Sequence, residues 1–153
     1  MKAYYVKNRN DMKRLFSFCA LDFNDESDGS FYIQSYKFNI WVKLQEDESV
    51  ICLNTSWPVR IGSSHHDLIS LANRCNQRLS FAQFCVSADS ENFNGFYQIS
   101  CKNGVDSRLL LRTMSMFASA FHDAVNFVDE DDLIGVDPEV ESACLQQQDA
   151  ILH

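Results

Sequence analysis

The stretch KFNIWVKL at residues 37–44 alternates apolar and polar side chains from its second residue to its last. A period of two predicts a β-strand with one buried and one exposed face. A second apolar run, VICLNTSW at residues 50–57, follows the polar turn at residues 46–49 and ends before Pro58, which cannot donate to a sheet ladder. With FYI at residues 31–33, these segments predict a three-stranded antiparallel meander.

Helical periodicity flanks these strands on both sides. Apolar residues recur at intervals of three and four over residues 12–19, 68–79 and 110–128, which predicts three amphipathic helices. Helices begin most often at Ser, Thr, Asp or Asn. The candidate N-caps are Asn10 or Asp11, a residue of SSHHD at 63–67, and Asp106 or Ser107.

A second hairpin is expected between the last two helices. Apolar runs at residues 81–86 and 96–101 are separated by NFNG at residues 92–95, and an Asn-Gly pair favours a tight turn. The whole order is helix, three strands, helix, two strands, helix. We therefore predict an α+β fold, with an antiparallel sheet packed by helices, in one domain over residues 1–128.

The net charge of −8 is unevenly distributed. Residues 1–128 hold all 13 Lys and Arg and 13 of the 21 Asp and Glu, whereas residues 129–153 hold the other 8 acids and no Lys or Arg. We expect residues 129–153 to form a mobile acidic tail, because like charges repel and Pro138 interrupts regular structure. The balanced body has no basic run or stripe, which argues against nucleic-acid binding.

The cellular compartment is suggested by hydropathy and cysteine usage. No stretch has the roughly 20 continuous apolar residues of a membrane span, and residues 1–10 lack the apolar run of a signal peptide. We expect a cytoplasmic protein without a membrane partner. The cysteines occur singly and are expected to be reduced; they are Cys19, Cys52, Cys75, Cys85, Cys101 and Cys144.

No segment predicts a catalytic, metal or cofactor site. His65, His66 and Asp67 are adjacent, but neighbouring histidines do not share a helix face, so helix capping explains them better. The loop at residues 24–29 begins like a calcium loop, yet Ser35 stands where a bidentate Glu is needed. No Cys-x-x-Cys pair is present, and a buried structural role is favoured for the strand and helix cysteines.

The polar face of the middle helix carries Asn73 and Asn76, three residues apart. Asn is a poor helix former because its side chain competes for backbone hydrogen bonds. The pair is explained by hydrogen bonds to a neighbouring loop, by contacts across a subunit interface, or simply by tolerance of a polar face.

The segment LISLANRCN at residues 68–76, followed by the strand at residues 81–86, resembles the YbjN family of bacterial proteins. The order of elements over about residues 10–128 is also similar to that of type III secretion chaperones, whose fold this family shares. The resemblance implies a noncatalytic cytoplasmic protein, usually dimeric, from a family labelled as sensory transduction regulators or chaperone-like proteins. It places the dimer interface on the middle helix, at Leu68, Leu71, Ala72 and Cys75.

The leading functional hypothesis is a homodimeric protein-binding regulator or chaperone-like adaptor with an unidentified protein partner. The exposed sheet and the first helix would hold an extended segment of that partner. An alternative is a small metal- or thiol-dependent enzyme that uses His65, His66 and a cysteine brought near them by folding. A third hypothesis makes the acidic tail an internal mimic that covers a binding surface.

Overall fold

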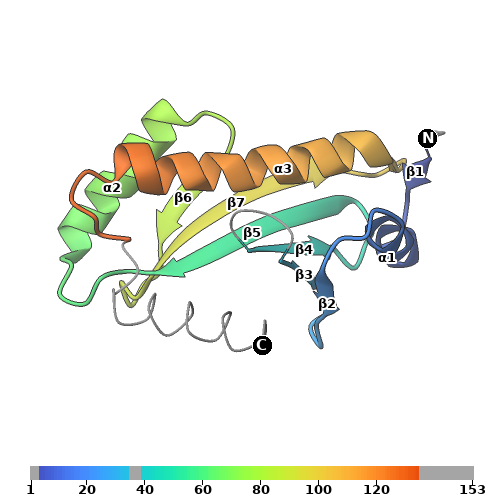
Figure 1. Ribbon diagram of the computed structural model, residues 1–153, viewed down its shortest axis with the longest axis horizontal. Helices are drawn as coiled ribbons and strands as arrows, with labels where there is room; N and C mark the ends of the chain where they lie inside the picture. Colours follow the sequence, from blue (N-terminus) through green and yellow to red (C-terminus); the bar gives the residue numbers. More distant parts are fainter. Residues whose placement is uncertain (1–3, 35–38, 135–153) are drawn as a thin grey trace, which may run out of the picture.

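The computed structural model describes residues 4–34 and 39–134, which fold into a main antiparallel sheet with helices on one face and a separate two-stranded pair (Figure 1). This confirms the predicted α+β fold class. The elements in chain order are β1 (Tyr5–Val6), α1 (Arg9–Phe18), β2 (Phe23–Asp25), β3 (Phe31–Ile33), β4 (Ile40–Leu44), β5 (Val50–Pro58), α2 (His65–Arg78), β6 (Gln83–Val86), β7 (Asn92–Ser100), β8 (Val105–Asp106), α3 (Ser107–Asp123) and the π-helical turn η1 (Ala124–Val128).

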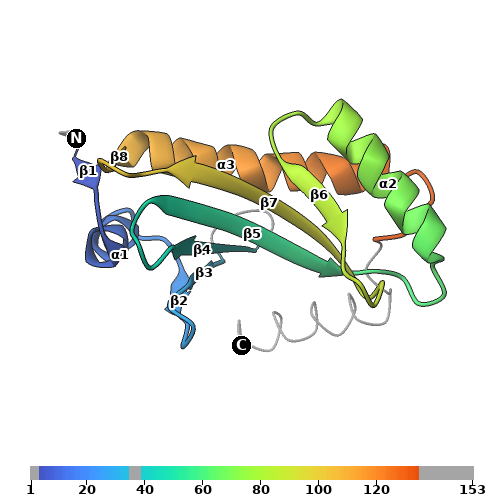
Figure 2. The same cartoon turned by 180° about the vertical axis from the view of Figure 1, so that it is seen from behind.

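The main sheet has the strand order β2-β3-β4-β5-β7-β6 within the described residues, and every neighbouring pair is antiparallel. Strands β5 and β7 are the longest and pair along their whole length, from Val50 opposite Ser100 to Pro58 opposite Asn92. They form the central ribbon that twists through both views of the molecule (Figure 2). The short pair of β1 and β8 ties the N-terminal segment to the start of α3.

The helices bury the inner face of this sheet. Helix α3 lies along β5 and β7, and the ring of Phe121 packs 6.2 Å from that of Phe93. At the other end α1 brings Phe16 edge-on to Phe31, with ring centroids 5.4 Å apart. The side chains at these contacts are fully buried. Burial of such large apolar surfaces is the main driving force that holds helices to a sheet.

The predicted turn at residues 92–95 is wrong, because these residues begin β7. The chain reverses earlier, where the amide of Ser87 donates to the carbonyl of Asn92 at 2.9 Å and Ser90 adopts φ 61°. Gly95 serves another purpose within the strand. A Cβ atom added there would lie 3.0 Å from Cδ2 of Phe121, so glycine lets α3 pack closely against β7.

The helix caps match the sequence predictions in part. Helix α1 is capped by Asn8, whose Oδ1 accepts from the amide of Asp11 at 2.9 Å, so the predicted caps Asn10 and Asp11 are wrong. Ser64 caps α2 and Asp106 caps α3, as predicted. The strands β1, β2 and β8 were not predicted, since they are two or three residues long and, unlike the FYI run of β3, carry at most two apolar side chains.

The described chain remains packed beyond α3. The carboxylate of Asp129 accepts hydrogen bonds from the amides of Leu133 at 2.8 Å and Ile134 at 2.7 Å. The amide of Arg60, just after β5, donates to the carbonyl of Leu133 at 2.7 Å, and the side chain of Ile134 is 1% exposed. Residues 129–134 are thus attached to the body, and the rest of the predicted tail, residues 135–153, lies outside the described residues.

Candidate functional site

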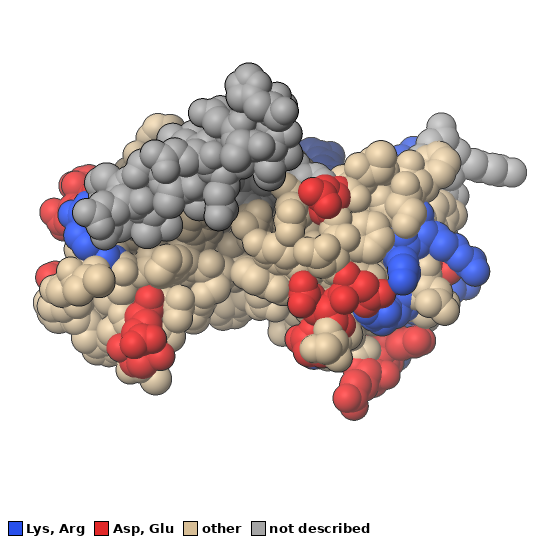
Figure 3. Space-filling view, turned by 60° about the horizontal axis from the view of Figure 1, so that its bottom comes forward, with Lys and Arg blue, Asp and Glu red and all other residues tan. Residues whose placement is uncertain are grey.

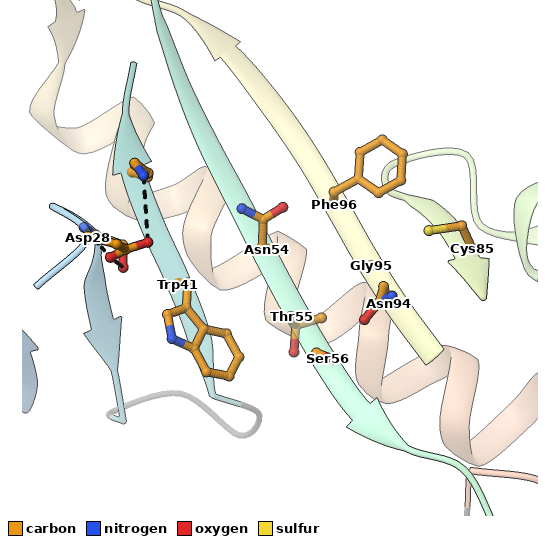
Figure 4. Close-up of a pocket in the computed structure, with 11 residues that line it drawn as sticks. Asp28, Trp41, Asn54, Thr55, Ser56, Cys85, Asn94, Gly95 and Phe96 are labelled. Carbon is orange, nitrogen blue, oxygen red and sulfur yellow. Dashed lines mark hydrogen bonds and ion pairs between the residues drawn. The ribbon is translucent and has the colours of Figure 1, made fainter. Parts of the chain in front are cut away.

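The outer face of the sheet is the most distinctive surface of the described chain. The side chains that alternate with the buried ones point away from α3, which passes behind the sheet in the close-up (Figure 4). Tyr32 stands opposite Trp41, Trp41 opposite Asn54, and Asn54 opposite Phe96 in the strand register. These four side chains form a row across β3, β4, β5 and β7, which we call the outer row.

A hollow of about 470 Å³ lies over the outer row from Trp41 to Phe96 (Figure 4). Trp41 and Phe96 stand on opposite sides of it, the amide of Asn54 lies between them, and Asn94 lines it from the strand that carries Phe96. The Trp41 ring is supported from β3 by Tyr32, with ring centroids 4.7 Å apart. Flat apolar side walls combined with amide donors and acceptors suit a polypeptide, which presents both apolar side chains and backbone polar groups.

One ion pair marks the rim of the hollow. Nζ of Lys43 lies 3.5 Å from the carboxylate of Asp28, and both side chains are largely exposed. Asp28 also accepts from the hydroxyl and amide of Ser30, and these hydrogen bonds, with Lys43, hold the pKa of its carboxyl below the usual value. Elsewhere on this side, Figure 3 shows mostly uncharged described surface, with the charged side chains gathered chiefly toward the end that carries α1.

The four predicted interface residues of α2 lie inside the protomer. Leu68, Leu71 and Cys75 are fully buried, and Ala72 nearly so. They pack under η1 and beside β6 rather than facing solvent. A side chain that is already buried has no surface left to bury against a second copy, so these residues are core residues of the protomer. The outward face of α2 instead carries Ile69, which is 42% exposed, and Asn73.

Asn76 contacts the edge of the sheet. Its Nδ2 donates to the carbonyl of Phe84 at 3.0 Å, and its Oδ1 accepts from the amide of Phe84 at 2.8 Å. Asn76 therefore makes two hydrogen bonds within the protomer, and they go to a strand rather than to a loop. Asn73 is exposed on the same helix.

The residues of the enzyme alternative are not brought together in the described part of the chain. Nδ1 of His65 contacts the hydroxyl of Ser90 at 2.6 Å, next to the capped start of α2. Among the residues described, no group of three or more His, Cys, Asp or Glu is placed to hold a metal. Burial raises the pKa of the Cys75 thiol to about 12, which keeps it protonated and poorly nucleophilic. Cys144 lies outside the described residues.

The calcium-like loop is committed to other contacts. Asp25 pairs with Arg9 and Lys13 of α1, and these hydrogen bonds lower the pKa of its carboxyl. Residues 23–25 are strand β2 rather than loop. The carboxylates of Asp25 and Asp28 therefore serve to hold α1 and the β2–β3 turn in place.

The described helices and strands define a type III secretion chaperone-like α+β fold. The chain belongs to the YbjN family, described as "Putative bacterial sensory transduction regulator", whose sequence model matches residues 16–130. No curated protein matches it in sequence. No helix in the described ranges is long and apolar enough to cross a membrane.

Solved structures of other proteins share the fold at low sequence identity. YbjN from E. coli superposes with a TM-score of 0.60 at 11% identity, over 79% of this chain and 94% of that chain. An uncharacterized protein from Methanothermobacter thermautotrophicus gives 0.60 at 10% identity, over 80% and 97% of the two chains. The HopA1-SchA chaperone-effector complex gives 0.50 at 10% identity, over 71% and 86%.

The resemblance led us to expect the exposed sheet to hold a partner segment, but the residues of the outer row were not identified from the sequence, although one signal was present. Trp41 occupies a position of the alternating strand that the pattern assigns to solvent, and Asn54 and Phe96 occupy outward positions in their own strands. Large aromatic residues at solvent-facing strand positions indicate an interaction surface when they lie together in one patch. These side chains align in one row because β5 pairs with β7, although α2 and β6 lie between the two strands in the sequence. No local pattern reveals this pairing.

Proposed function

We propose that this chain is a noncatalytic, protein-binding regulator or chaperone-like adaptor, and that the outer face of its sheet holds an extended segment of the partner. The observation that carries the proposal is the outer row, where Trp41 and Phe96 flank the amide of Asn54 on a sheet face that no described helix covers. Family membership and the chaperone-like fold support the same class of function.

An extended peptide fits this surface for a physical reason. Alternate side chains of a strand-like segment point the same way, about 7 Å apart, so one can fill the hollow while its neighbours lie over Tyr32 or beyond Phe96. The amide of Asn54 can donate and accept at once, which matches a peptide group. Aromatic contacts and hydrogen bonds to the peptide backbone do not depend on one particular peptide side chain. Peptides of varied sequence can therefore bind, as an adaptor requires.

We further propose that the protein acts as a homodimer in the cytoplasm. The five described cysteines are all free, which fits a reducing compartment. Since the inward face of α2 is occupied by the core, the outward face with Ile69 and Asn73 is the part of this helix that can meet a second copy.

Selection of peptides from a displayed library on the purified full chain tests the binding proposal. We expect enrichment of extended peptides that contain apolar side chains, bound with micromolar affinity. Phe96→Asp should weaken their binding at least tenfold, because it places a charge in the apolar wall, equivalent to about 1.4 kcal/mol of binding free energy.

Met116→Asp is the matched control. Met116 is 43% exposed on α3, the helix that packs on the opposite face of the sheet. This variant should bind the selected peptides as the parent does. Equal loss in both variants, with both still folded by circular dichroism, would show that the peptides do not bind at the outer row.

A further inference from the structure

We infer that residues 135–153 of this same chain occupy the hollow over the outer row when no partner is bound. The inference rests on the proposed function, since it takes the hollow to be a binding surface. It adds the identity of one occupant, a C-terminal segment that the partner has to displace.

The anchoring of the last described residues supports this inference. Asp129 accepts from the amides of Leu133 and Ile134, and Arg60 donates its amide to the Leu133 carbonyl. Arg60 and Asp132 also form an ion pair. These contacts bring the chain from the helix side of the sheet to the end of β5, and both ribbon views show the described chain stopping beside the tip of that strand (Figures 1 and 2).

Distance along β5 makes the hollow reachable. Asn54 precedes Arg60 by six residues, which correspond to roughly 20 Å of strand. The 19 residues from 135 to 153 span about 28 Å even if fully helical and about 60 Å if extended. The segment can therefore reach the hollow whether it is helical or extended, and its attachment point keeps its local concentration near the surface high, on the order of millimolar.

The composition of the segment complements the hollow. It contains apolar side chains that would suit the walls formed by Trp41 and Phe96; they are Val136, Val140, Leu145, Ile151 and Leu152. Its acids include Asp137, Glu139 and Glu141, and the rim of the hollow carries Lys43. Lys43 pairs with an exposed carboxylate at 3.5 Å, and such surface pairs are weak enough to be exchanged for another acid.

The test compares three full-length proteins in which Trp57→Phe leaves Trp41 as the single tryptophan. The first has no other change. The second carries Val140→Asp and Leu145→Asp, which remove apolar side chains from the segment. The third carries Ser142→Asp and Gln147→Asp, which add the same charge at polar positions. Acrylamide quenching of Trp41 fluorescence is measured on each, alone and with a synthetic peptide of residues 135–153.

We expect the quenching constant of Trp41 to rise about twofold in the second protein only, because a bound segment shields the ring from solvent. Added peptide should restore the protection. Equal quenching in all three proteins, with no response to the peptide, would overturn the inference.

A library-selected peptide, added to the same proteins, separates this inference from the proposed function. We expect the second protein to bind it about tenfold more tightly than the other two, because no internal segment competes. Equal binding of the peptide by all three proteins would contradict the occupation of the hollow by residues 135–153, while the proposed binding surface would stand. A selection that enriches no peptide on any of the three proteins would instead overturn the proposed function.

Discussion

The side-chain amide of Asn76 occupies both backbone hydrogen-bonding groups of Phe84, with Nδ2 to the carbonyl at 3.0 Å and Oδ1 to the amide at 2.8 Å. Phe84 lies in β6, one of the two edge strands of the main sheet. An uncovered edge invites pairing with another chain. A helix side chain thus takes the place of the missing strand, which explains an asparagine within α2.

Asn76→Ala should lower the free energy of unfolding by about 1–3 kcal/mol, because it leaves two polar groups of an edge strand without their partner. Urea unfolding monitored by circular dichroism measures the loss. Asn73→Ala on the same helix is the control and should change stability by less than about 0.5 kcal/mol. A larger effect from Asn73 than from Asn76 would contradict this role.

Gly95→Ala should also destabilise the fold, by about 1–3 kcal/mol, since the new methyl group meets Phe121 at 3.0 Å and Thr55 Cγ2 at 3.2 Å. Combining it with Phe121→Leu should cost less than the sum of the two single changes, because the smaller side chain makes room. A double-mutant cycle of urea unfolding measures this coupling. Strict additivity would show that the strand does not need glycine for this contact.

The two faces of α2 should respond differently to a charge. Leu71→Asp should unfold the protein, because Leu71 is fully buried in the core and a buried unpaired charge is costly. Ile69→Asp, on the exposed face, should leave the fold intact and shift the dimer toward monomer in size-exclusion chromatography with light scattering. A parent protein that is monomeric at high concentration would contradict the proposed dimer.

Cys75 and Cys85 should differ in thiol reactivity. Burial raises the pKa of Cys75 to about 12, so its thiol stays protonated between pH 7 and 9, whereas Cys85 is exposed. Alkylation followed by mass spectrometry should modify Cys85 in the folded protein and Cys75 only after unfolding. Because the unfolded thiol ionises first, Cys75 also lowers the free energy of unfolding as the pH rises above about 9. Rapid labelling of Cys75 in the folded protein would contradict its burial and would support the alternative of a thiol-dependent enzyme.

Elements with a strong local period were predictable from sequence. The alternation that ends at Leu44 and the run that ends at Trp57 correspond to β4 and β5, and helical spacing located all three α-helices of the described chain. The Asn94-Gly95 pair was misassigned because packing against Phe121 outweighs its preference for a turn.

The candidate site was less predictable because it depends on long-range pairing. Periodicity shows that Leu68 and Leu71 share an apolar face, but it cannot tell whether that face meets the protomer's own core or a second copy. Likewise, Trp41 and Phe96 are 55 positions apart in the sequence and share one surface only through β5. Strand order is the information that the local pattern lacks.

The most direct test of the binding surface is a nuclear magnetic resonance titration of the ¹⁵N-labelled protein with a library-selected peptide, followed at the side-chain amides of asparagine. Asn54 and Asn94 line the hollow, whereas Asn76 is bonded to Phe84 on another part of the fold. We predict that the side-chain amide signals of Asn54 and Asn94 shift with saturable dependence on peptide while those of Asn76 remain in place. Saturable shifts confined to α2 or to the outer side of α3, with Asn54 and Asn94 unmoved, would contradict the account.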